Sequence, residues 1–106
     1  MLKTITPIDN SIYVERKYAK DEDIEKTLSS SKKSFQGWKE TSLNNRKKII
    51  SVFVENFLQN NEEIEDQLCR QIGRPISQCN GEMRGFKERA LYMIEKSDDA
   101  LKNVIS

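Results

Sequence analysis

Residues 60–86, NNEEIEDQLCRQIGRPISQCNGEMRGF, predict two helices joined by a sharp turn. The turn is Gly73-Arg74-Pro75, since glycine tolerates left-handed backbone and proline cannot continue a helix. Asn60, followed three residues later by Glu63, predicts a capping box at the start of the first helix. Each helix has one apolar face at helical spacing, formed by Ile64, Leu68, Cys69 and Ile72 in the first and by Ile76, Cys79, Met83, Phe86, Ala90 and Met93 in the second.

A further amphipathic helix is predicted before this unit. Asp21 is its expected N-cap, and the acidic residues of its first turn suit the positive end of the helix dipole. Gly37 is the expected end of the helix. Steps of four and three residues define its apolar stripe, which consists of Ile24, Leu28, Ser31, Phe35 and Trp38.

The helix that comes next in the chain begins near Thr41 or Ser42, either of which can cap it. Its apolar residues occupy more than one face and are Leu43, Ile49, Ile50, Val52, Phe53, Val54, Phe57 and Leu58. A helix with this pattern is expected to be the most buried of the four.

The first nineteen residues predict a β-hairpin. Residues 4–6 and 11–14 are rich in β-branched and aromatic side chains, and residues 7–10 supply the turn. The predicted fold class is therefore mainly α with a short N-terminal β-hairpin, as a single segment over residues 1–106 with helices from residue 20 onward. The last helix is expected to continue past residue 99 toward Val104. Since a lone two-stranded ribbon is marginal in water, the hairpin is expected to need a partner.

Composition limits the classes of function. Leu, Ile, Val and Phe make up 26 of the 106 residues, which is enough for a folded chain, but the mean hydropathy of -0.75 is low for an unaided core. A net charge of +1 favours neither nucleic acid nor an anionic membrane as a partner. Two cysteines and no histidine exclude a Cys/His zinc site and a histidine-based triad within this sequence.

The residues with potential chemistry each have a plain structural interpretation. Cys69 and Cys79 lie on apolar helix faces and are predicted to be buried small side chains rather than activated nucleophiles. The basic run of residues 46–48, with Lys32 and Lys33, is predicted to be a solvated helix face rather than a nucleic-acid site. No catalytic, cofactor-binding or metal-binding residue is predicted.

One helical glycine indicates a partner. Gly85 lies inside the last helix, between Glu82 and Arg89 on the same helix, although glycine in a helix costs about 1 kcal/mol relative to alanine. Its use there suggests the close approach of another element.

The order of these parts resembles the N-terminal segment of the NAD(P)-dependent aldehyde dehydrogenase superfamily, from about residue 5 to residue 104. Residues 6–11 stand where that family has its opening Asn-Pro turn. Trp38 and Arg46 match a frequent aromatic residue and a frequent arginine. Gly73-Arg74-Pro75 matches a Gly-Lys-Pro stretch, and Glu82 matches a frequent acidic residue.

The resemblance implies the N-terminal part of an α/β fold whose Rossmann and catalytic portions lie beyond residue 106. The full-length enzyme would use NAD or NADP, whereas this chain alone is expected to be non-catalytic and to hold no cofactor. Because the long helix borders the aldehyde entrance in the family, Glu82, Gly85, Phe86 and Arg89 become candidate residues of the substrate-channel wall. The implied partners are the remainder of an aldehyde dehydrogenase, on the same or a separate chain, and other subunits of a homo-oligomer.

An alternative function is a stand-alone helical interaction module that docks on a dehydrogenase or another protein through residues 43–58. The opening residues lack a continuous apolar stretch and a small-residue cleavage site, so a secretory signal is not predicted and the expected location is the cytoplasm.

Overall fold

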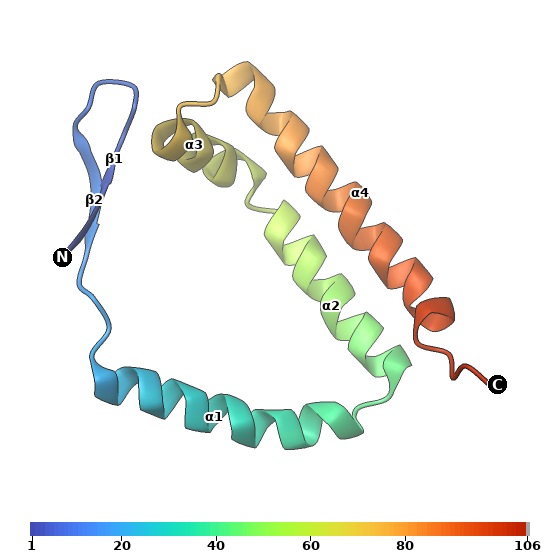
Figure 1. The fold of residues 1–106 in the computed structure, drawn as a ribbon. Helices are drawn as coiled ribbons and strands as arrows, with labels where there is room; N and C mark the ends of the chain where they lie inside the picture. The colour runs from blue at the N-terminus through green and yellow to red at the C-terminus, as the bar shows by residue number, and fades with distance from the viewer. Residues whose placement is uncertain (106) are drawn as a thin grey trace.

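The computed structural model describes residues 1–105 and consists of a two-stranded hairpin followed by four helices (Figure 1). The elements are β1 (Leu2–Ile5), β2 (Ile12–Arg16), α1 (Asp21–Glu40), α2 (Leu43–Leu58), α3 (Asn61–Ile72) and α4 (Ile76–Ala100). The predicted fold class, mainly α with an N-terminal β-hairpin, is confirmed.

The strands of the hairpin pair antiparallel, with Thr4 opposite Val14, and the register shifts between Thr4 and Ile5. Asn10 adopts a positive φ of 64° in the connecting turn, which asparagine tolerates better than most residues. The backbone N–H of Thr6 donates to the carbonyl of Ser11 at 2.9 Å and closes the turn. Ile12 is exposed, so the ribbon has no fully covered face.

Helix α1 differs from its prediction at both ends. Its N-cap is Lys20 rather than Asp21, and the Lys20 backbone N–H donates to the Asp23 carboxylate at 3.4 Å. The helix passes through Gly37 and ends at Glu40, where Thr41 turns to extended backbone. The Thr41 hydroxyl donates to the Gly37 carbonyl at 3.0 Å, which satisfies one acceptor of the last turn. Gly37 is therefore accommodated inside the helix, because the hydrogen bond from Thr41 to its carbonyl stabilises the last turn.

The predicted N-cap of α2 forms, whereas the predicted capping box of α3 does not. Ser42 caps α2 as predicted, since its hydroxyl accepts the backbone N–H of Asn45 at 3.2 Å. Asn60 precedes α3 as predicted, but the capping box with Glu63 does not form. The Asn60 side chain instead donates to the carbonyl of Asn56 at 2.9 Å, because the chain passes directly from α2 into α3.

The predicted turn between α3 and α4 is confirmed. Gly73 adopts left-handed backbone with φ 72°, and its N–H donates to the carbonyl of Cys69 at 2.9 Å. A Cβ atom added to Gly73 would lie 2.7 Å from Cγ of Pro7. The hairpin turn therefore packs against the end of α3, and only glycine provides the space for this contact.

Helix α4 passes through residues 97–99 and includes Ala100, as predicted, but its predicted continuation to Leu101 and Val104 is wrong. Leu101 and Val104 are exposed, so no burial stabilises another helical turn. This outcome agrees with the low helix propensity of residues 97–99, Ser-Asp-Asp, which precede the end.

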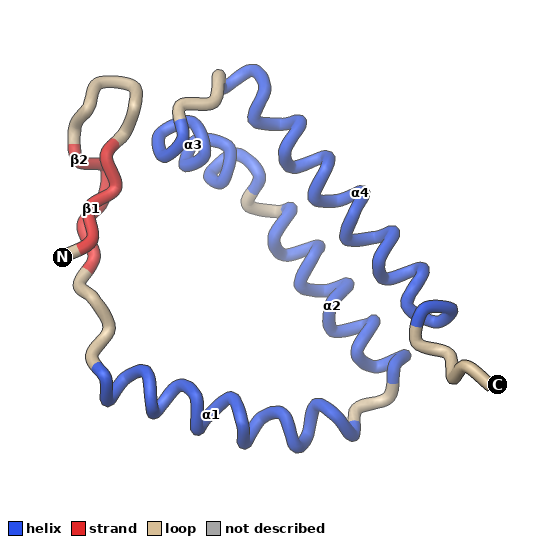
Figure 2. Tube along the Cα trace, viewed as in Figure 1, coloured by secondary structure: helices blue, strands red, loops and turns tan. Residues whose placement is uncertain are grey.

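The packed part of the molecule is small. Helix α4 packs against both α2 and α3, and the buried apolar side chains of the described residues are Val54, Cys79 and Met83. The prediction that α2 is the most buried helix is wrong, because Ile49, Val52 and Phe53 are each about half exposed. Helix α4 lies along one side of α2 only, and Ile49 and Val52 remain exposed (Figure 2).

Helix α1 stands apart from this packed unit (Figure 2). All of its residues are exposed, including the apolar stripe of Ile24, Leu28, Phe35 and Trp38. The radius of gyration is 18.7 Å, whereas a compact chain of this length has about 13 Å. The accessible area of 9054 Å² likewise exceeds the value of about 6,100 Å² for a folded monomer of this mass. The fold is open, with extensive apolar surface.

Candidate functional site

The four residues predicted to line a channel all lie on α4. Glu82 forms an ion pair with Arg74, which belongs to the turn before the helix. Glu82, Phe86 and Arg89 also line one open hollow of about 380 Å³, together with Ala90 and Met93. These three side chains thus share one hollow on α4, and their role in a substrate channel stays a prediction.

Gly85 lies under a side chain of its own helix. The three atoms nearest to a Cβ placed on Gly85 all belong to the Arg89 guanidinium, at 3.3 to 3.9 Å. The expected close approach of another element is thus not made by the described residues. The Arg89 side chain lies over Gly85, and the surface above it is open.

Phe86 connects this hollow to a second surface. Its ring packs on Phe57 of α2 with centroids 4.5 Å apart, and Phe57 in turn lies 6.0 Å from Phe53. This aromatic row joins the C-terminal part of α2 to the middle of α4. Phe53 and Phe86 of the row also line a groove between the two helices.

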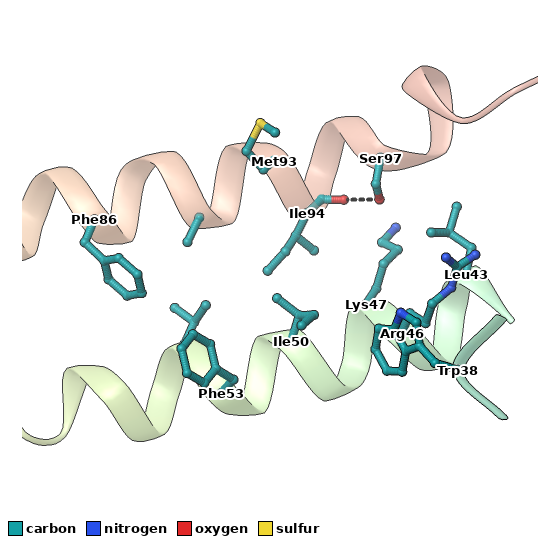
Figure 3. Close-up of a pocket in the computed structure, with 12 residues that line it drawn as sticks. Trp38, Leu43, Arg46, Lys47, Ile50, Phe53, Phe86, Met93, Ile94 and Ser97 are labelled. Atoms are coloured by element: carbon teal, nitrogen blue, oxygen red, sulfur yellow. Dashed lines mark hydrogen bonds between the residues drawn. The ribbon is translucent and has the colours of Figure 1, made fainter. Parts of the chain in front are cut away.

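The groove between α2 and α4 has a volume of about 320 Å³ and an almost entirely apolar wall (Figure 3). It is lined by Trp38, Leu43, Arg46, Lys47, Ile50, Phe53, Val54, Phe86, Ala90, Met93, Ile94 and Ser97. The sequence analysis did not predict this groove. The signal was present, because Leu43, Ile50 and Val54 recur at helical spacing, but the spacing does not reveal how far two helices separate.

Basic residues stand at one end of the groove, beside Trp38 (Figure 3). Lys47 pairs with Asp98 of α4. Arg46 is half-buried, and its Nε is fully covered without a hydrogen-bond partner. The prediction of a uniform solvated basic face is therefore wrong for Arg46 and Lys47. They lie one turn from Leu43 and Ile50, on the side of α2 that faces α4, while Lys48 is exposed.

Over residues 1–105, no group of histidine, cysteine, aspartate or glutamate side chains is arranged to hold a metal ion. Within the same range, the helices are too short or too polar to cross a membrane.

Comparison with known protein families gives one match that covers the sequence: the model of the aldehyde dehydrogenase family matches residues 1–106. The chain belongs to the aldehyde dehydrogenase family. The resemblance that the ordered motifs carried is thereby confirmed, and the hairpin and four helices are the form that this stretch of the family takes here.

Catalysis in an aldehyde dehydrogenase needs a reactive cysteine, and Cys79 does not fit that role. Cys79 is fully buried, as predicted, and burial raises the pKa of its thiol above its usual range. Its Sγ lies 3.5 Å from the carbonyl oxygen of Pro75 and 3.7 Å from that of Arg74. Cys69 is only half-buried, and both residues are free thiols. A buried thiol with a raised pKa is a poor nucleophile.

Proposed function

We propose that this chain is the N-terminal segment of an NAD(P)-dependent aldehyde dehydrogenase and becomes part of a working enzyme only together with the cofactor-binding and catalytic portions. The complete enzyme would oxidise an aldehyde to a carboxylic acid and reduce NAD or NADP. In that enzyme, Glu82, Gly85, Phe86 and Arg89 would contribute to the wall of the substrate channel.

The observation that carries this proposal is the exposed area. The chain exposes about 2,900 Å² more than a compact monomer of its mass. Much of that area belongs to the stripe on α1 and to the outer side of α2. Burial of apolar area contributes roughly 25 cal/mol per Å², so covering these faces would strongly favour association with the rest of an enzyme.

The test uses an aldehyde dehydrogenase from which the matching N-terminal segment has been removed, here called the truncated dehydrogenase. We expect no reduced nicotinamide when the chain alone is mixed with NAD or NADP and a panel of aldehydes. We expect the chain and the truncated dehydrogenase to form a complex that regains oxidation. Turnover by the chain alone would contradict the proposal, as would failure to bind the truncated dehydrogenase.

A second candidate function is an interaction module that docks on an intact dehydrogenase. The half-exposed Ile49 and Val52 on α2 favour it, because they form an apolar surface outside the α2–α4 groove. A stable complex with the full-length enzyme, which already has its own N-terminal segment, would support the module. Binding to the truncated dehydrogenase only would support the first proposal.

We also propose a cytoplasmic location. The two free thiols support it, because reducing compartments keep cysteines unpaired. Thiol labelling of the protein isolated from its own cells tests this point, and a disulfide in the native protein would contradict it.

A further inference from the structure

The α2–α4 groove combines an apolar wall with one cation, Arg46, that has no ion-pair partner among residues 1–105. Its wall is built by aliphatic and aromatic side chains along most of its length, and Arg46 stands at the end nearest Trp38 (Figure 3). A guanidinium remains charged at any physiological pH. Its Nε is covered by the chain itself and has no hydrogen-bond partner among residues 1–105.

Several other cations of the chain have carboxylate partners nearby. Lys47 pairs with Asp98, Arg74 with Glu82 and Arg70 with Asp66. The ion pairs of residues 1–105 do not include Arg46. Covering a charged group without a counter-charge is costly, so an acidic group is expected on whatever covers the groove.

We propose that the groove binds a segment of the rest of the aldehyde dehydrogenase that carries apolar side chains and one carboxylate, and that this carboxylate pairs with Arg46. The inference rests on the proposed function and deepens it, because it names the chemistry of the contact. The apolar side chains of the segment cover Ile50, Phe53 and Met93. Its aspartate or glutamate supplies the counter-charge that Arg46 lacks among residues 1–105.

The exposed area favours the rest of the enzyme over a second copy of this chain. A standard interface buries about 800 Å² on each partner, well below the excess of about 2,900 Å² found here. The exposed apolar residues also lie on different elements, which do not form one flat surface: the α1 stripe, the outer side of α2 and Leu91 to Met93 on α4. A large partner that wraps several elements covers them, whereas one small globular copy does not.

The first experiment measures the affinity of the chain for the truncated dehydrogenase by titration calorimetry. Removing one member of a desolvated charge pair weakens binding strongly, so Arg46→Gln is expected to lower the affinity by about thirtyfold or more. Lys48→Gln is the matched control, because Lys48 is the neighbouring exposed cation and its loss is expected to change the affinity by less than about threefold. Circular dichroism of both variants checks that the helices persist.

The outcomes separate the two proposals. Absence of any complex overturns the proposed function and this inference together. A complex that Arg46→Gln and Lys48→Gln weaken equally leaves the proposed function standing and overturns only the Arg46 pair. Dimerisation of the chain that blocks the groove against the truncated dehydrogenase makes a second copy the occupant and also overturns the inference.

A second variant identifies the carboxylate even if Arg46→Gln unfolds. Arg46→Lys keeps the positive charge and presents a primary amine, which a carbodiimide couples directly to a touching carboxylate. We expect one cross-linked peptide in the complex, joining position 46 to an acidic residue of the truncated dehydrogenase. Cross-links from this position only to Asp98 would overturn the pairing.

Trp38 reports whether the segment lies in the groove. It is the only tryptophan of the chain and lines the groove, so fluorotryptophan labelling gives one fluorine resonance there. That resonance is expected to shift when the truncated dehydrogenase binds. An unchanged resonance in a saturated complex would place the contact elsewhere and overturn the inference.

Discussion

Helix α1 and the α3–α4 unit are both amphipathic, but only the second has found a partner within the chain. In α3–α4, a left-handed glycine turns the chain back and Cys79 and Met83 become buried. In α1, every residue remains exposed although its apolar stripe has the same spacing. The comparison shows that hydrophobic periodicity defines which face of a helix is apolar. Whether that face becomes buried depends on whether a turn brings another helix of the chain back onto it.

The largest expected effect contrasts two methionines of α4. Met83→Ala should lower the free energy of unfolding by about 3 kcal/mol, because Met83 is buried and its removal leaves a cavity. Met93→Ala should change it by less than about 0.5 kcal/mol, because Met93 is 69% exposed. Urea denaturation followed by circular dichroism measures both. Equal losses would mean that the packed unit is not where the structure has it.

A pair of glycines gives the next largest effect, with opposite signs. Gly73→Ala should destabilise by about 2 kcal/mol, since alanine is strained at φ 72° and its Cβ would meet Pro7. Gly37→Ala should stabilise α1 by about 0.5 kcal/mol, because Gly37 is helical and a Cβ there meets nothing within 4 Å. Thermal unfolding of the two variants checks the signs. A stabilising Gly73→Ala would contradict the packing of the hairpin turn on α3.

Alkaline pH is expected to lower the free energy of unfolding by less than the methionine and glycine substitutions do. Burial raises the pKa of Cys79, so the folded state keeps its proton while the unfolded state loses it above a pH of about 8.5. Stability from this group is therefore fully present at neutral pH and falls as the pH rises through that value. Denaturation curves at neutral and alkaline pH measure the loss, which Cys79→Ala should reduce. An unchanged loss in Cys79→Ala would assign it to other groups.

The smallest effect on stability is expected on α1. Leu28→Ala should change the free energy of unfolding of the isolated chain by less than about 0.5 kcal/mol, because Leu28 is 60% exposed. The same change should weaken binding to the truncated dehydrogenase by about tenfold, since the leucine becomes buried in the complex. Calorimetry with and without the truncated dehydrogenase measures both values. A large loss of stability in the isolated chain would show that α1 already packs within it.

The elements themselves followed from local chemistry. The hairpin, the four helices, the serine cap at Ser42 and the turn at Gly73 depend on backbone preferences and on hydrogen bonds within a few residues, which the sequence displays directly. Local reasoning was wrong where two local options competed. Asn60 donates back to the preceding helix instead of forming a capping box, and Gly37 is accommodated inside α1.

The sequence by itself also determined membership of the family, because an ordered set of short motifs can be recognised without knowing which residues are in contact. Only the tertiary structure decided which apolar faces are covered and that Arg46 and Lys47 line a groove between α2 and α4 instead of a solvated face. It also showed that the Arg46 Nε has no hydrogen-bond partner among residues 1–105. The physical reason is that burial depends on the distances between elements far apart in the chain. Hydrophobic periodicity specifies the direction of a side chain but not what that side chain meets.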